Sequence, residues 1–272
     1  MRWRTMVPRA AAEATAVMRM LRPPRAGLRI LMYHAVGSPV RGDRLGIFSV
    51  YPERFRCHVE ILAKTARVHA VSLDPLHMPQ HQLNVAVTFD DGYQDNLRVA
   101  APILIENGIP FSVFVTTDFI RQATKGFLSP LELREITSLP GVTVGAHGRS
   151  HRSLTECSDQ DLAEELTGSR QYLEDLLGCR ITTVAYPHGA ADQRVRAATQ
   201  RAGYTIGLCS RFDINRTGHD PLMLSRCNIL RDDSPRVLRQ KLRGDWDWYR
   251  WRSANPLGLT GAGMYSSGYE QK

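Results

Sequence analysis

Two adjacent carboxylates, Asp90 and Asp91, stand at the end of an apolar run in the segment VTFDDGYQDN. Neighbouring side chains of a strand point to opposite faces, so both acids can face one site only if the backbone turns between or just after them. Gly92 permits such a turn. A cation beside the pair would offset the repulsion of the like charges. An Asp-Asp-Gly segment is also an ordinary solvent-exposed turn, and spacing alone favours neither interpretation.

Two histidines four residues apart, His147 and His151, lie in the segment GAHGRSH. In a helix or tight turn this spacing brings both imidazoles to one side, as binding of a divalent metal requires. Two histidines and one carboxylate form a common catalytic zinc set that leaves a coordination position for water. One acid of the pair at 90–91 can complete this set, and the other then remains to accept a proton.

Apolar runs of strand length alternate with helical periodicities, which predicts a mainly parallel sheet covered by helices. Strands are expected at 28–34, 66–73, 84–91, 110–117 and 142–147, helices at 55–65, 96–108, 129–139 and 158–178, and the alternation continues to residue 251. No glycine-rich phosphate loop follows a strand, so we expect a closed or partly closed α/β barrel. Reactive groups of such barrels lie where strands end, which places these residues on one rim: His34, Asp90, Asp91, His147, Tyr186, Pro187 and His188.

Five segments together resemble the polysaccharide deacetylases of carbohydrate esterase family 4: LMYHAVG, VTFDDGYQDN, IPFSVFV, GAHGRSH and AYPHG, in the family's order. The resemblance covers about residues 28–230. It implies an α/β fold, a distorted (β/α) barrel of about seven strands in a single domain. It also implies a metal-dependent hydrolase that removes N-acetyl groups from amino sugars of a polysaccharide or lipid-linked glycan. A catalytically silent carbohydrate-binding domain of the same fold is the alternative, which the intact acids and histidines disfavour.

The resemblance also implies a role for each motif residue. Asp90 matches the general base. The ligands of one divalent ion, most often Zn²⁺ with Co²⁺ or Ni²⁺ also compatible, would be Asp91, His147 and His151. The substrate would contact Tyr186, Pro187 and His188, and a backbone N–H near Pro187–His188 would hold the oxyanion.

The leaving amine needs a general acid. Most of the family uses a C-terminal Leu-x-x-His segment, which this chain lacks. Its LMYH segment instead resembles the circularly permuted branch that includes the poly-N-acetylglucosamine deacetylases, in which the N-terminal strand brings in the histidine. The resemblance therefore implies that His34 is the acid, whereas a histidine hydrogen-bonded to backbone at a strand end is the alternative.

The chain departs from the family pattern at three positions. Gly148 stands where Ser or Thr usually follows the first metal histidine, so one supporting hydrogen bond is expected to be missing. Ala185 replaces an arginine that pairs with the base, and we predict that Arg226, at a strand end, reaches Asp90 instead. His188 stands where tyrosine is common, so either the sugar contact changes or only its backbone is used.

Composition and charge bound the remaining expectations. The net charge of +8 comes with no aromatic-basic recognition motif, so no nucleic-acid partner is expected. The basic composition of residues 1–26 predicts an N-terminal extension, interpreted as an amphipathic helix in peripheral contact with a membrane. Residues 27–252 form the predicted catalytic domain, and the Gly- and Ser-rich residues 253–272 a flexible tail.

Five cysteines without a C-x-x-C pair and no clear signal peptide favour a cytoplasmic or cytoplasmic-membrane-associated protein. The oligomeric state is left open.

Overall fold

A nearly closed barrel of parallel strands forms the centre of the protein in a computed structural model, which describes residues 26–65, 67–68 and 81–250. Seven strands follow one another in the order β10-β1-β5-β6-β7-β8-β9, and β4 pairs with β5 beside this path. Backbone hydrogen bonds between Leu224, just before β10, and residues 207 and 209 join the two ends of the sheet. The distorted (β/α) barrel predicted from the sequence is confirmed.

The strands of the barrel are short except for two. They are β1 (Gly27–Tyr33), β4 (Arg67–Val68), β5 (Leu83–Phe89), β6 (Phe111–Val115), β7 (Val142–Ala146), β8 (Thr183–Ala185), β9 (Ile206–Leu208) and β10 (Arg226–Asn228). A separate small sheet pairs β2 (Ala35–Val36) with β3 (Ser49–Val50).

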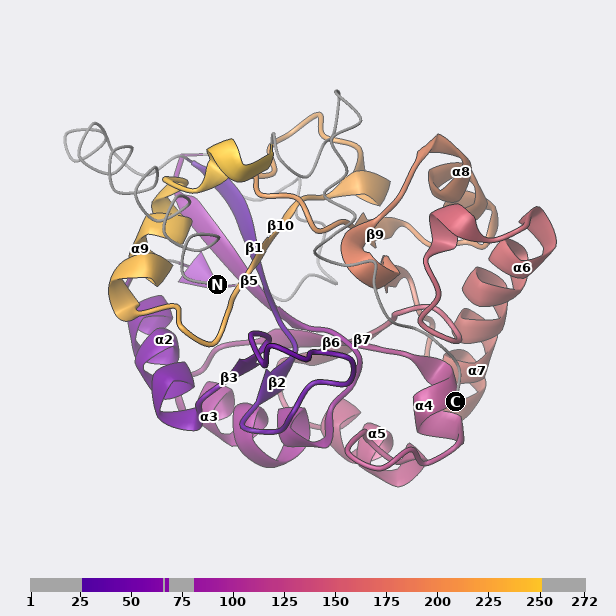
Figure 1. The fold of residues 1–272 in the computed structure, drawn as a ribbon, viewed down its shortest axis with the longest axis horizontal. Coiled ribbons are helices and arrows are strands. Elements are labelled where there is room, and N and C mark those ends of the chain that lie inside the picture. Colours follow the sequence, from indigo (N-terminus) through magenta and orange to yellow (C-terminus); the bar gives the residue numbers. More distant parts are fainter. Residues whose placement is uncertain (1–25, 66, 69–80, 251–272) are drawn as a thin grey trace.

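Helices surround the strands on the outside (Figure 1). They are α2 (Pro52–Thr65), α3 (Ala101–Glu106), α4 (Thr117–Arg121), α5 (Pro130–Thr137), α6 (Asp159–Ala163), α7 (Ser169–Leu177), α8 (Gln193–Arg201) and α9 (Pro235–Arg243). A π-helical turn (Asn96–Ala100) leads into α3, and a second one (Glu164–Gly168) joins α6 to α7. The sequence pattern did not indicate α4, which begins within the residues expected to end a strand.

Apolar side chains explain why the two long strands lie at the centre. Both β1 and β5 are buried along their whole length, as expected for strands of a parallel sheet covered on both faces. Their register pairs Gly27 with Leu83 and Tyr33 with Phe89. Both strands therefore end at the same level, and the residues that follow them meet on one rim.

Several sequence predictions fall outside the described residues. These are the basic extension apart from residue 26, the rest of the strand expected at 66–73 beyond β4, and the C-terminal tail. Within the part that is described, Trp246 is buried and its indole N–H donates to Gln240. No helix among the described residues is long and apolar enough to cross a bilayer.

A buried ion pair fixes the last helical segment against the barrel. Arg29 on β1 donates to Asp247 through both terminal nitrogens, at 2.6 and 3.1 Å, and both side chains are buried. Gly244 ends α9 with a φ of 84°. A Cβ there would lie 2.5 Å from the Asp247 carboxylate and 2.9 Å from the Arg29 guanidinium, so glycine is required both for the turn and for the ion pair.

We predict that Arg29→Met destabilises the fold strongly, because it removes the guanidinium that balances the charge of the buried Asp247 carboxylate. Loss of one member of a buried pair costs about 3–5 kcal/mol. Urea unfolding followed by circular dichroism measures the change. The matched control is Arg56→Met in the exposed pair Arg56–Glu106, which spans 3.7 Å and should leave the free energy of unfolding unchanged. Equal effects of the two substitutions would contradict the prediction.

Candidate metal and catalytic site

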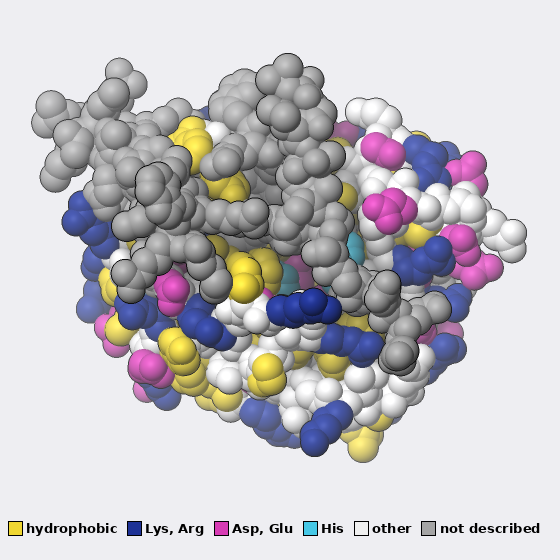
Figure 2. All heavy atoms as spheres, viewed as in Figure 1, with side chains coloured by type: hydrophobic (Ala, Val, Ile, Leu, Met, Phe, Trp, Pro, Cys, Tyr) yellow, Lys and Arg dark blue, Asp and Glu magenta, His cyan; other side chains and the backbone are white. Residues whose placement is uncertain are grey.

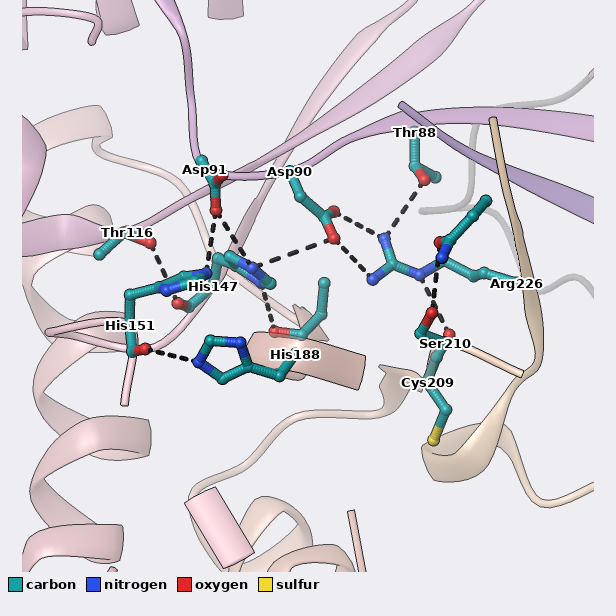
Figure 3. Close-up of polar contacts among 12 residues, drawn as sticks. Thr88, Asp90, Asp91, Thr116, His147, His151, His188, Cys209, Ser210 and Arg226 are labelled. Carbon is teal, nitrogen blue, oxygen red and sulfur yellow. Dashed lines mark hydrogen bonds and ion pairs between the residues drawn. The ribbon is translucent and has the colours of Figure 1, made fainter. Parts of the chain in front are cut away.

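The turn after β5 directs both acids toward one site (Figure 3). Asp91 itself has a φ of 72° and Gly92 a φ of 82°, so the chain turns at the second acid and continues to turn at the glycine. A Cβ at Gly92 would lie 2.8 Å from the Val115 side chain. The predicted turn between or just after the acids is confirmed, and the aspartates face the same rim despite being neighbours.

Three side chains from two different strand ends converge on one point. Asp91 Oδ1 lies 3.1 Å from His151 Nε2 and 3.4 Å from His147 Nε2. One ligand atom from each of the three residues lies within 4.8 Å of the others. The sequence prediction named this set of ligands, and the structure brings all three together.

Hydrogen bonding fixes which nitrogen of His147 faces the site. Its Nδ1 lies 2.8 Å from the carbonyl oxygen of Ala185, and because a carbonyl can only accept, Nδ1 carries the proton. Nε2 of the neutral ring then presents its lone pair to Asp91. Backbone carbonyls orient metal-binding histidines in this way. Burial is the main cause that lowers the pKa of His147 to about 4, so the ring is uncharged at neutral pH, with its one proton on Nδ1.

The arrangement fits a divalent cation. Asp91 Oδ1 is buried and accepts no hydrogen bond from the described residues, an expensive state for a carboxylate oxygen unless positive charge lies close by. Burial alone would lower the pKa of His151, but the charge of Asp91 outweighs it and the pKa is raised. The carboxylate therefore attracts positive charge to the point where the two Nε2 atoms meet. Two imidazole nitrogens and one carboxylate oxygen are ligands that zinc accepts.

Asp90 has a different partner from its neighbour. Arg226 on β10 donates to its two carboxylate oxygens at 2.6 and 2.7 Å, and both side chains are buried. The same guanidinium donates to Thr88 Oγ1 and to the carbonyl of Cys209. Burial alone would raise the pKa of Asp90, but Arg226 outweighs it and the pKa is lowered. The contact predicted for Arg226, in place of the arginine absent at Ala185, is present.

His34 lies next to these acids because β1 and β5 end in register. Its ring packs on Phe48 with 4.9 Å between ring centres, and a positive charge on it would lower the pKa of both Asp90 and Asp91. The buried Nδ1 atom has no hydrogen-bond partner among the described residues. The alternative of a histidine held to backbone is therefore not seen at this nitrogen.

Two buried residues that the sequence analysis did not single out hold the His34 segment in place. Asn96 donates to the carbonyl oxygen of His34 at 2.9 Å. Asp95 accepts hydrogen bonds from the backbone N–H groups of Val36 and Ser38, at 2.9 and 3.0 Å. An Asp-Asn pair five residues after the first acid was the available signal, because polar residues at the start of a helix often bind nearby backbone.

The substrate contacts predicted for the third motif need correction. Tyr186 is fully buried and its hydroxyl donates to the carbonyl of Leu222 at 2.7 Å, so its side chain is not available to a substrate. Pro187 is buried against Gly148. Only His188 is partly exposed; it has a φ of 60°, and its Nε2 donates to the carbonyl of His151 at 3.2 Å.

The site is reached from one face of the molecule. Histidine and acidic side chains are visible in a hollow near the centre of this face, with basic side chains beside it (Figure 2). Phe119, whose ring centre lies 6.3 Å from that of His151, is partly exposed and carries the Arg41 guanidinium at 5.0 Å. An aromatic and a cationic group therefore lie beside the predicted metal ligands.

Comparisons with known proteins relate part of the chain to one family. Residues 77–207 match the family model described as polysaccharide deacetylase. YxkH of Bacillus subtilis (strain 168), whose name places it among the polysaccharide deacetylases, is 26% identical over 189 residues, 67% of this chain and 64% of its own. Chitin deacetylase 1 of Cryptococcus neoformans is 27% identical over 119 residues, 44% of this chain and 24% of its own. The chain thus spans less than two thirds of either relative.

Solved structures share the fold. The Streptococcus pyogenes deacetylase PplD, in complex with acetate, superposes with a TM-score of 0.70 at 23% identity, covering 81% of this chain and 99% of its own. IcaB from Ammonifex degensii superposes with a TM-score of 0.68 at 23% identity, covering 80% and 97%. On the family match, and with the acid pair and the histidine pair inside it, residues 77–207 carry the sequence of a polysaccharide deacetylase domain.

We predict that His151→Ala abolishes metal binding and that His188→Ala does not. The two rings lie 4.7 Å apart, but only His151 belongs to the group that converges on Asp91. Metal-free protein, incubated with Zn²⁺ and desalted, should retain about one equivalent in the wild type and in His188→Ala, and none in His151→Ala. Elemental analysis gives the numbers, and retention of zinc by His151→Ala would show that the ligand set is wrong.

Proposed function

We propose that this protein is a polysaccharide deacetylase, which hydrolyses N-acetyl groups on amino sugars of a polysaccharide or lipid-linked glycan with one divalent ion, Zn²⁺ above all. The observation that carries the proposal is the convergence of Asp91, His147 and His151 on one point, with the ion-paired Asp90 beside them. A relative named as a chitin deacetylase supports a glycan as the substrate.

Asp90 is the proposed general base. Its Oδ2 lies 3.9 Å from His147 Nε2, close to the cation site but outside the three ligands. Arg226 orients the carboxylate through two hydrogen bonds and keeps it ionised, since it lowers the pKa of Asp90. Each carboxylate oxygen retains a lone pair that can accept a proton from water.

A carboxylate with a lowered pKa is a weak base, so the water it deprotonates must be made more acidic. A divalent ion held by Asp91, His147 and His151 would supply this by acidifying water, and would polarise the acetamide carbonyl. The two acids therefore have different roles, because Arg226 pairs with one and the cation site includes the other. Asp91 balances the cation, and Asp90 takes the proton.

His34 is the proposed general acid. The amine of the sugar leaves only after protonation, and His34 stands on the same rim as Asp90 with its Nδ1 free of hydrogen bonds to the described residues. Asn96 fixes the backbone at this position through the carbonyl of His34. The oxyanion is assigned to the backbone N–H of His188 together with the cation, as an extension of the same proposal.

The decisive experiment is acetate release from N-acetylglucosamine oligomers by metal-free and zinc-loaded protein. We expect activity only with metal. Asp90→Asn should retain zinc and lower kcat by about 10²–10⁴, because it removes a general base, whereas Asp91→Asn should lose both zinc and activity. Stoichiometry by elemental analysis and acetate by coupled assay distinguish the two variants.

The alternative, a silent carbohydrate-binding domain, makes the opposite prediction. It would bind the oligomers without releasing acetate at any zinc concentration. If zinc binds and acetate is still not released from polymeric or lipid-linked N-acetylated sugars, the proposed hydrolysis is wrong although the metal site is right.

Substituting His34 tests the general acid through the leaving group. We expect His34→Gln to lower kcat/KM for N-acetyl sugars by about 10²–10⁴. Hydrolysis of an aryl acetate ester should be nearly unchanged, because a phenolate leaves without protonation. His219→Gln, a partly exposed histidine on another loop, is the control. Equal losses on both substrates would indicate that His34 does not act as an acid.

A further inference from the structure

The segment 147–151 carries both imidazole ligands, and one buried acid from another element holds it. Glu165 is 4% exposed. Its carboxylate accepts hydrogen bonds from the backbone N–H of Arg149 at 2.7 Å, from the backbone N–H of Ser150 at 3.0 Å, and from the Ser150 hydroxyl. All three donors belong to the residues between the two histidines, so a single side chain holds the backbone that connects them.

Gly148 makes room for this carboxylate. It has a φ of 70°, and a Cβ there would lie 3.1 Å from Glu165 Oε2 and 3.2 Å from the Pro187 ring. The hydroxyl residue expected by family resemblance at this position would crowd the carboxylate and the proline and would adopt a strained positive φ. The missing supporting hydrogen bond predicted from Gly148 is thus replaced by a different group, which approaches because the side chain is absent.

The helix that carries Glu165 has an irregular turn at this point. Residues 164–168 form a π-helical turn between α6 and α7, and such insertions change the direction of side chains and often lie at functional sites. The Ser169 hydroxyl donates to the carbonyl of Glu165 at 2.6 Å. The neighbouring Glu164 is exposed and pairs with the Arg149 side chain at 3.2 Å, so the two acids of the turn point to different environments.

The loop needs such support because its last residue is strained. His151 has a φ of 67°, a region that residues other than glycine rarely adopt and that persists only where the surroundings hold it. Two backbone hydrogen bonds from the first residues of α4 hold the segment, Thr117 N to Gly148 O and Asp118 N to Arg149 O. Glu165 holds it through the backbone N–H groups of Arg149 and Ser150.

We propose that Glu165 is a positioning residue for the metal site. It fixes the segment 147–151, in which Gly148 and His151 have a positive φ, so that His147 Nε2 and His151 Nε2 meet at Asp91 before a cation binds. The inference rests on the metal site of the proposed function and adds a residue that touches neither metal nor substrate. Gly148 and Glu165 act as a matched pair, since a side chain at 148 would crowd the carboxylate that binds the backbone of residues 149 and 150.

The test is the Zn²⁺ affinity of the full chain, stripped of metal and titrated against a chromogenic chelator. Glu165→Gln keeps the shape of the side chain but removes its charge and replaces one accepting oxygen by an NH2 group that can only donate. We expect it to weaken binding by about 10–100-fold. Ser150→Ala removes one of the three donors and should weaken binding less. Glu164→Gln, on the same turn but exposed, is the matched control and should bind as the wild type does.

Thermal melting of the metal-free proteins separates positioning from general stability. A lower melting temperature with unchanged zinc affinity in Glu165→Gln would overturn the inference, because the acid would then be structural only. If Glu165→Gln fails to fold, Ser150→Ala decides, and wild-type affinity in that variant is equally contrary. If the wild type binds no zinc, the proposed function and the inference both fail. If the wild type releases acetate but Glu165→Gln binds Zn²⁺ as tightly as the wild type does, the proposed function stands and only the inference about Glu165 fails.

Discussion

The structure depends on how two adjacent buried carboxylates are kept ionised. Like charges on neighbouring residues repel, and burial raises the free energy of each charge. The charge of Asp90 is balanced by Arg226, which donates to both carboxylate oxygens. The charge of Asp91 is balanced by positive charge at the point where the two imidazole Nε2 atoms approach it. Because the balancing groups differ, the acids are no longer equivalent. One can bind a cation while the other stays available to accept a proton.

The barrel supplies these partners from distant parts of the chain. Residues 30–32 of β1 pair with 226–228 of β10 on one side, and the whole of β1 pairs with β5 on the other. The arginine and the acid are therefore two strands apart, with Arg226 pointing into the barrel over the Phe114 ring at 5.9 Å. A short β10 suffices, since only its first side chain needs to reach Asp90.

The sequence was sufficient where the reactive residues lie together in one short segment. The acid pair, the histidine pair and the parallel barrel follow from local residue types and periodicity, and Arg226 could be assigned because a partner for Asp90 was missing. The prediction that the Tyr186 side chain contacts the substrate was wrong, because a motif does not show which way a side chain points. The Tyr186 hydroxyl occupies the space that a side chain at Gly207 would fill. Glu165, Asp95 and Asn96 were missed because helical acids and amides are common, and only tertiary contacts distinguish those that bind backbone.

Backbone strain gives the last indication that the site is formed in advance. Four described residues other than glycine have a positive φ, and three of them are Asp91, His151 and His188. Each such conformation costs of order 1–3 kcal/mol and persists only where neighbouring contacts over-determine it. Those contacts are the hydrogen bonds to the loops after β6, β7 and β8. Because the folded scaffold already supports the strained turns, a cation or substrate need not supply that free energy on binding, and the reacting groups can keep their positions throughout a reaction cycle.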